Sequence, residues 1–517
     1  MKRARCYFVG GLLLSFIFMA TTLINTPAWA QTTKTGGYLT IIIPGTTGKN
    51  IGYTPEPFAP RDILMIAPCL ETLLHYDKKG EQIPWLVTSW KWNPDWKSLT
   101  LDLRKGVKFH DGTDFNAEAV KYNLELIIKS PKEAFKSVKS IDVIDNYSLR
   151  LNFDTYDGSI LPALSQDEAR MISPTAVEKN GKGWASVHPV GTGPFKFKEF
   201  RRDSLLQYEK FEDYWQEGKP YLEGIEFKLI ANKVTARMSF EAGEGKMIVG
   251  LQANDTYGLK QEGKYIVNTS FSSGISGLVG DGANPDSVFR DVRVRKAMAY
   301  AINREDICKN IFHDLNLPGH VLAVPGSKAY NPSVEGYSYD PAKAMALLKE
   351  AGYGDSNKPK IKLNVASVFD YTWVVACQGY LNKVGFDAQM ELLAYPKYTA
   401  IRSTEGWKNG TCWISIRMNQ LTEPSRAIQR AYTDFIKMIR PPELETTLNN
   451  AMNEPDPSKA RALYMEAQRL MVDKYCILAP VYLGGQNSIT YPEVKDTGLY
   501  IDFGNDQWTP EDIWLSK

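Results

Sequence analysis

Residues 83–124 constrain the fold more than any other part of the chain, because a hairpin, a loop and a helix signal follow one another there. Leucines at every second position of 99–103 predict a half-buried strand, and the Asn-Pro-Asp turn at 93–95 reverses the chain before it. Asn116 is a favourable N-cap, and apolar residues recur at helical spacing over 117–124. The segment therefore predicts two antiparallel strands followed by an amphipathic helix.

A second segment, residues 361–392, predicts a parallel sheet. Apolar and polar residues alternate over 361–365 and again over 386–392, which is the pattern of two strands. Residues 371–384 between them are long enough for a helix, which Gly385 ends. Strand, helix and strand in this order are typical of a βαβ crossover, so the sequence indicates the α/β class.

Local signals of the same kinds predict further elements. A helix starts after Asp340, which is placed to cap it, and another starts at Asp456-Pro457. Asp291 and Arg295 lie four positions apart on another predicted helix, and we expect them to pair there. The remaining strands and helices are predicted at residues 38–43, 141–153, 221–230, 291–303, 340–352 and 477–483.

The length of 517 residues exceeds what one hydrophobic core supports, so two or three domains are expected. Two glycines and two prolines fall within 189–197, and Gly484-Gly485 follows a predicted strand. Both places are typical of rigid turns or crossings between domains. Two crossings mean that the chain leaves one lobe and later returns to it. We therefore expect a discontinuous first lobe, which also carries the hairpin-rich segment as an insertion.

The N-terminus has the order of a secretory signal peptide. Three basic residues within the first five precede an apolar run from 6 to about 24, and Ala28-Trp29-Ala30 follows. Cleavage after Ala30 is expected. The apolar run is long for this purpose, so an uncleaved membrane anchor is the alternative. Either form places the rest of the chain outside the cytoplasm.

Charge and cysteine content narrow the function classes. Removing the three positive charges of the signal changes the formal net charge from +2 to −1, so nothing favours nucleic acid as a partner. Five cysteines remain, an odd number without C-x-x-C spacing, and we expect most of them to be buried as small apolar residues. They are Cys69, Cys308, Cys377, Cys412 and Cys476.

Five short motifs together indicate a family. They are WKWNPD at 90–95, LRKGVKFHDG at 103–112, GTGPFKF at 191–197, FRDVRVRKAMAYAINR at 289–304 and YDPAK at 339–343. In this order they closely resemble the extracellular solute-binding proteins of the peptide/nickel family, which deliver ligands to ABC importers. The resemblance covers most of the mature chain, and its motifs belong mainly to the scaffold.

The resemblance implies a two-lobe periplasmic-binding-protein type II fold with an extra subdomain inserted in the first lobe. A ligand would be enclosed between the lobes by hinge closure. The implied partners are a small-molecule or peptide ligand and the membrane permease of an ABC importer, for a monomer in the periplasm. The expected domains are the signal peptide at 1–30, lobe I at 31–65, 189–283 and 484–517, the inserted subdomain at 66–188, and lobe II at 284–483.

The resemblance also implies which residues face the ligand. They are Tyr53, Thr54, Arg170, Tyr398, Trp407, Trp413 and Arg417. In nickel-binding relatives an arginine at the position of Arg170 meets a carboxylate-bearing chelator, and aromatic walls beside a guanidinium suit the same group. The alternative for Arg170 is a structural salt bridge with Asp167 or Glu168. The alternative for the tryptophans is packing in the core of the lobe.

One departure from the family bears on the ligand. Peptide-binding relatives place an aspartate after a Gly-Trp pair to hold the peptide's amino terminus, but residues 407–424 contain only Glu423 as an acid. A buried amine needs an anion to offset its desolvation. Peptide-class ligands are the family's default. Metal chelates, opine-like compounds and other carboxylated solutes stay open, as does a role as a ligand-sensing adapter to a chemoreceptor.

Motifs of catalysis and metal binding are missing from the sequence. It contains neither a Gly-x-Ser-x-Gly elbow nor an H-E-x-x-H pair, and the glycine spacing at 45–49 is wrong for a phosphate loop. Pro318-Gly319 separates His313 from His320, which argues against a paired metal site. We expect no catalytic residue, cofactor or metal. An exported hydrolase on the same fold is the alternative.

Overall fold

The computed structural model describes residues 36–58, 62–77, 81–132, 134–271, 274–323, 325, 330–407, 410–416, 438–499, 508 and 510–516. The predicted signal peptide lies outside these residues. Among the helices that they form, none combines the length and the apolar character needed to cross a membrane.

The apolar run predicted at 38–43 forms the centre of a seven-stranded mixed sheet. Its strand β1 (Tyr38–Pro44) pairs in parallel with β10 (Gly224–Ile230) on one side and with β11 (Met247–Val249) on the other. A strand that is covered on both faces is expected to be apolar throughout. The strand order is β12-β19-β11-β1-β10-β9-β8, with β8 at Phe195–Arg201, β9 at Leu205–Lys210, β12 at Ile266–Ser270 and β19 at Gln486–Thr490.

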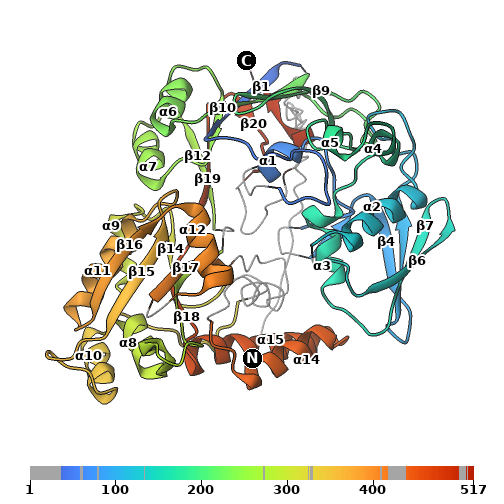
Figure 1. Ribbon diagram of the computed structural model, residues 1–517. Coiled ribbons are helices and arrows are strands. Elements are labelled where there is room, and N and C mark those ends of the chain that lie inside the picture. The colour runs from blue at the N-terminus through green and yellow to red at the C-terminus, as the bar shows by residue number, and fades with distance from the viewer. Residues whose placement is uncertain are drawn as a thin grey trace, which may run out of the picture. The chain divides into compact units, whose positions relative to one another are not determined.

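Two helices, α6 (Lys233–Glu241) and α7 (Ala253–Gln261), lie beside this sheet (Figure 1). Phe240 of α6 and Leu259 of α7 pack with Ile42 of β1 in one buried apolar cluster. A separate apolar cluster contains the alternate β1 side chains, among them Ile41, together with residues of the short helix α1 (Asp62–Ile66). Both faces of β1 are therefore buried.

The second sheet has six strands and contains the predicted βαβ unit. Strand β15 (Lys360–Ala366), helix α11 (Thr372–Lys383) and strand β16 (Asp387–Leu393) follow one another, and the two strands pair in parallel. This confirms the crossover predicted from alternation and helix length. The strand order is β14-β18-β13-β17-β15-β16, with β13 at Ile275–Gly280, β14 at Leu317–Pro318, β17 at Gly410–Ile416 and β18 at Leu478–Leu483.

The hairpin-rich segment forms a separate four-stranded antiparallel sheet of order β4-β5-β7-β6. The leucines at 99–103 point into a buried cluster with the apolar face of α2 (Ala117–Lys129), whose N-cap is Asn116 as predicted. The strands are β4 at Val87–Trp92, β5 at Ser98–Leu103, β6 at Val138–Asp145 and β7 at Ser148–Phe153, and a two-stranded ribbon, β2 at Leu74–Tyr76 and β3 at Gln82–Pro84, lies next to them in sequence.

The other described elements are short strands and helices. The helices are α3 (Ile160–Leu164), η1 (Asp167–Ala169), α4 (Pro174–Asn180), α5 (Lys182–Ala185), η2 (Val288–Arg290), α8 (Val292–Ala301), α9 (Arg304–Asn310), α10 (Pro341–Glu350), α12 (Tyr395–Ala400), η3 (Ile401–Glu405), α14 (Pro442–Asn453), α15 (Pro457–Arg469), η4 (Leu470–Lys474) and η5 (Pro510–Asp512). The strands β20 (Val494–Lys495) and β21 (Trp514–Leu515) pair with each other. Asp340 caps α10 as predicted, and Asp456, where the start of a helix is predicted, caps α15.

Strand membership in the sheets is discontinuous along the chain. The seven-stranded sheet draws its strands from 38–44, from 195–270 and from 486–490. One strand differs from the expected boundaries: β13, which the predicted limit at 283 assigns to the first lobe, pairs with β17 and β18 in the six-stranded sheet. The change of sheet therefore falls between β12 and β13. The domain limits themselves stay a prediction.

The predicted pairing of Asp291 with Arg295 is wrong. Asp291 caps α8 and forms its ion pair with Arg293. The Arg295 side chain is buried and donates to the carbonyl oxygens of Phe289, Arg290, Tyr475 and Cys476. Helical spacing brings residues four apart close together, but a guanidinium that is taken out of water needs more acceptors than one exposed carboxylate supplies.

Candidate functional site

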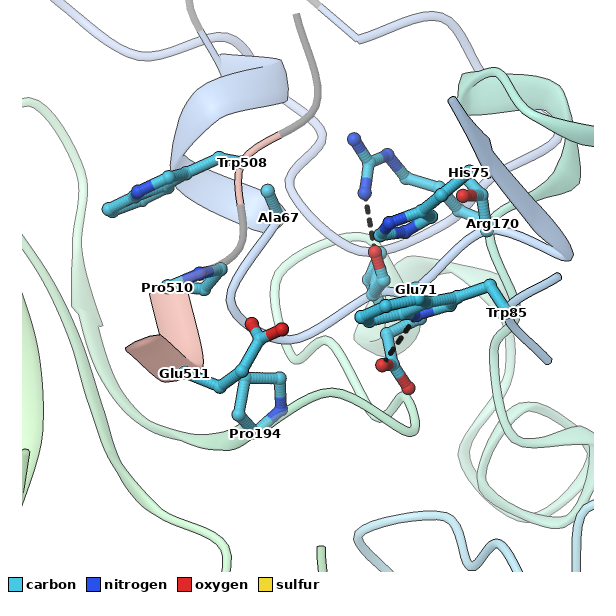
Figure 2. Close-up of a pocket in the computed structure, with 11 residues that line it drawn as sticks. Ala67, Glu71, His75, Trp85, Arg170, Pro194, Trp508, Pro510 and Glu511 are labelled. Atoms are coloured by element: carbon cyan, nitrogen blue, oxygen red, sulfur yellow. Dashed lines mark hydrogen bonds between the residues drawn. The ribbon is translucent and has the colours of Figure 1, made fainter. Parts of the chain in front are cut away.

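One cavity among the described residues combines charged and aromatic walls. The space open to water-sized molecules is about 20 Å³, close to what a single water needs. Figure 2 shows Trp508, Pro510 and Glu511 on one side of it and His75, Trp85 and Arg170 on the other. The two sides come from opposite ends of the sequence, since η5 at the C-terminus faces β2 and the bend before β4.

Arg170 is the predicted ligand residue that lines this cavity. Its Nε donates to Asp167 Oδ1 at 2.8 Å, and its Nη1 donates to the Leu70 carbonyl. The side chain is 7% exposed. The salt bridge with Asp167 fits a structural role for Arg170, and its position on the cavity wall fits a ligand role. Both roles are compatible, because within the described residues Nη2 forms no hydrogen bond.

An imidazole-indole stack forms the wall next to Arg170. The rings of His75 and Trp85 lie 3.8 Å apart at 8°. Burial and the nearby positive charge of Arg170 lower the pKa of His75 to about 3. His75 is therefore neutral at physiological pH, and Arg170 is the cationic group of this wall.

Glu71 lies at the base of the cavity and is the most heavily hydrogen-bonded carboxylate of the site. It accepts from Trp85 Nε1 at 2.9 Å, Thr192 Oγ1 at 2.7 Å, Tyr214 OH at 2.9 Å and Trp215 Nε1 at 3.2 Å. Burial raises its pKa to about 7, against the opposing effect of these donors. Sequence reasoning missed this residue, although a single acid within the apolar run at 69–74 was a usable signal.

Glu511 is the second buried carboxyl of the cavity, and sequence reasoning missed it too. Its only recorded side-chain hydrogen bond within the described residues is from Gln216 Nε2 at 3.4 Å. Burial, helped by the nearby acids Asp512 and Glu71, raises the pKa of Glu511 to about 8. No local pattern marks it, because the partners that bury it lie hundreds of positions earlier in the chain.

Tyr53 and Thr54, the other predicted residues of the first lobe, lie in the loop after β1 and do not line the cavity. Asn50 holds this loop by accepting the Tyr53 backbone N–H at 2.8 Å. The Thr54 carbonyl accepts from Lys132 Nζ at 2.6 Å, and the Thr54 side chain is fully buried. The loop thus joins the seven-stranded sheet to the hairpin-rich segment, and a ligand role for it stays a prediction.

The predicted residues of the second lobe are placed differently. Tyr398 is 1% exposed and Trp407 is 3% exposed, and both belong to the apolar core around the six-stranded sheet. The backbone of Trp413 pairs with Leu278 in the register of β13 and β17. The side chain of Trp413 and all of Arg417 lie outside the described residues. Among the predicted residues whose side chains the structure describes, only Arg170 lines the cavity.

The histidines outside the cavity contact other protein side chains, and the described cysteines are buried. His313 stacks on Tyr257 at 4.2 Å and bonds Asn254, whereas His320 bonds Glu305. Over the described part of the chain, no group of three potential ligands could hold a metal ion. Four cysteines are buried and free, namely Cys69, Cys308, Cys377 and Cys476. The Cys412 side chain lies outside the described residues.

A family model and a curated relative both match this chain as a solute-binding protein. The model of the bacterial extracellular solute-binding proteins, family 5 Middle, matches residues 81–421. The glutathione-binding protein GsiB of Pectobacterium atrosepticum is 26% identical over 510 residues, which is 93% of this chain and 94% of that protein. The match therefore extends over nearly the full length of a curated relative.

Solved structures share the fold. NikA from Brucella suis in complex with Fe(III)-EDTA has a TM-score of 0.82 at 22% identity, covering 93% of this chain and 100% of that one. The periplasmic binding protein DppA from Helicobacter pylori in complex with the peptide STSA has a TM-score of 0.78 at 23% identity, covering 94% and 99%. At such identities the likeness is evidence for the fold alone.

Proposed function

Because the chain belongs to the family 5 bacterial extracellular solute-binding proteins, we propose that it captures a small peptide-class solute and delivers it to an ABC importer. Binding by this fold needs no covalent chemistry. A solute that contacts both lobes favours the closed form, because those contacts exist only when the lobes are closed. The permease is then offered a closed, loaded protein.

The proposed ligand is a small molecule with at least one carboxylate. The relative GsiB is named for glutathione, and the two solved structures hold a peptide and an EDTA chelate. All three kinds of molecule carry carboxylates. The observation that carries the proposal to this chain is the buried Arg170 guanidinium on the wall of the cavity, beside a neutral His75. A guanidinium can meet a carboxylate with two parallel hydrogen bonds.

Several finer points belong to the same proposal. The mature protein begins after Ala30, works in the periplasm as a monomer, binds no nucleic acid and does not alter its ligand. Trp413 and Arg417 form part of the second wall of the binding site. Incubation of a bound solute with the purified protein should return it unchanged, and a product in the mass spectrum would argue for the hydrolase alternative.

Native mass spectrometry is the first test of the ligand class. Protein purified from the periplasm without unfolding should carry a co-purified mass that fits a short peptide, and calorimetry with reduced glutathione should show saturable binding. A retained metal chelate or an opine-like mass would replace the peptide class by one of the alternatives. Absence of binding to glutathione, to di- and tripeptides and to chelates would contradict the proposal.

Substitution of Arg170 tests the carboxylate anchor. Arg170→Lys keeps the positive charge but removes the planar fork, so affinity for glutathione should fall by roughly tenfold or more. Arg150→Lys is the matched control, because Arg150 is exposed on β7 and pairs with Asp142 at 3.3 Å. Both variants should melt within a few degrees of the wild type. If calorimetry gives the wild type, Arg170→Lys and Arg150→Lys the same affinity for glutathione, Arg170 does not contact the ligand.

A further inference from the structure

The two carboxyl groups of the cavity are satisfied to very different degrees. Glu71 accepts hydrogen bonds from four side chains. Glu511 is 2% exposed, and its carboxyl group accepts a long hydrogen bond from Gln216 and one from its own backbone N–H. Figure 2 shows the Glu511 carboxyl group on the side of Trp508 and Pro510, across from Trp85. Glu71 is thus part of the scaffold, whereas the buried Glu511 carboxyl lines the cavity with one side-chain hydrogen bond among the described residues.

The cations of this region form their direct pairs with other groups. Lys219 pairs with Asp512, although its charge also lowers the pKa of Glu511 somewhat. Arg170 bonds Asp167 and the Leu70 carbonyl. Arg104 lies 4.2 Å from the centre of the Trp215 ring and donates to the Trp85 carbonyl at 2.8 Å. A buried carboxylate that lacks a paired cation is costly, which is why burial raises the pKa of Glu511 to about 8.

The size and the walls of the cavity limit which positively charged group could balance the Glu511 carboxylate. The open space of about 20 Å³ holds a group of the size of water. An ammonium group has that size and offers three donors. The indoles of Trp85 and Trp508 line the same space, and aromatic faces attract cations.

We propose that this cavity is the subsite for a primary ammonium group of the solute, with Glu511 as its counter-charge. The inference rests on the proposed solute-binding function and narrows its ligand to solutes that carry a primary amine. It also explains how an amine could be bound although residues 407–424 contain no aspartate. The anion for the amine comes from η5 near the C-terminus instead of from that stretch.

A minimal probe tests the subsite without the full ligand. Thermal unfolding of the mature protein at pH 8.5 is compared in methylammonium chloride and in sodium chloride of equal concentration. Methylammonium should raise the wild-type Tm by about 1 °C or more relative to sodium. Glu511→Gln should abolish the difference and Glu511→Asp should keep part of it. Glu212→Gln, an exposed control paired with Lys210, should behave as the wild type.

Calorimetry with two peptides forms the second arm. Glutathione and its analogue without the α-amino group are titrated into the wild type and into Glu511→Gln. The variant should bind glutathione roughly tenfold or more weakly, with the affinity for the analogue unchanged. Equal loss for both peptides, or no loss, would overturn the subsite.

The two arms separate the subsite from the proposed function. A methylammonium effect that needs Glu511, combined with no peptide binding by the wild type, would keep the subsite and contradict the peptide class. Peptide binding by the wild type, combined with an equal methylammonium effect in wild type and Glu511→Gln, would contradict the subsite and keep the function.

Discussion

At the scale of single residues, neutral hydrogen-bond partners hold two buried ionisable groups, Glu71 and Arg304. Glu71 receives two indole N–H groups and two hydroxyl groups, which come from separate turns of the chain. Arg304, which is fully buried, donates to the carbonyls of Gly319, Pro480, Ala299 and Ile302. Such groups bind several segments at once, so their removal leaves several buried partners unsatisfied.

Replacement of Glu71 should therefore be strongly destabilising. Glu71→Ala leaves the donors of Trp85, Thr192, Tyr214 and Trp215 without their acceptor, at an expected cost of about 3–5 kcal/mol in the free energy of unfolding. Urea denaturation followed by tryptophan fluorescence measures it. Glu212→Ala, on an exposed side chain, should stay within about 0.5 kcal/mol of the wild type. A similar small effect for Glu71→Ala would show that the four donors find other acceptors.

At the scale of elements, α8 shows how one helix uses two arginines differently. Arg293 is exposed and pairs with Asp291 at 2.6 Å. Arg295, two positions on, is buried and links the start of the helix to the carbonyls of residues 475 and 476. Arg295→Met keeps most of the volume but loses these bonds, so it should cost about 2–4 kcal/mol. Arg293→Met should cost less than about 1 kcal/mol.

The comparison of these two variants checks the placement of α8 against the segment after η4. Both substitutions are identical in chemistry and lie in the same helix, so helix propensity cancels between them. Chemical denaturation of both proteins in the same buffer gives the difference directly. Equal costs for the two variants would mean that the Arg295 bonds contribute nothing beyond an exposed ion pair.

Elements with local causes were predictable from the sequence. Alternation located β5, β15 and β16, the caps Asn116 and Asp340 located the starts of two helices, and Asp456-Pro457 located a third. The predicted pairing of Asp291 failed because Arg295 donates to backbone carbonyls, two of which belong to residues 180 or more positions later. Local spacing describes which side chains can meet along a helix, but burial decides which partners they need.

At the scale of the whole molecule, the candidate site was predictable only where a family motif reaches it. Arg170 came from the resemblance to nickel-binding relatives, and it lines the cavity. Glu71 and Glu511 lie 440 positions apart and meet only because β19 returns the chain to the first sheet before η5. No periodicity within either segment carries that information. The cavity is a product of the discontinuous chain path.

The pH dependence of global stability follows from four buried groups. The pKa values of His75 and His110 are lowered from 6.5 to about 3 and about 4, so stability falls as the unfolded chain takes up protons below pH 6.5. Glu71 and Glu511 have pKa values raised from 4.5 to about 7 and about 8, so stability is lost as pH rises from 4.5 towards 8. The opposing slopes cancel between 4.5 and 6.5.

The expected profile is therefore a plateau with a decline on each side. Above pH 6.5 only the two carboxyl groups titrate, and at about 1.4 kcal/mol per proton and pH unit the wild type should lose roughly 2–3 kcal/mol by pH 8.5. Glu511→Gln removes the larger step, so its stability should fall by less than about 1 kcal/mol over the same interval and exceed that of the wild type at pH 8.5. Urea titrations at half-unit pH steps measure both curves. Parallel curves above pH 6.5 would show that Glu511 is already ionised in the folded protein, in which case a cation inside the protein, and not the solute, balances its charge.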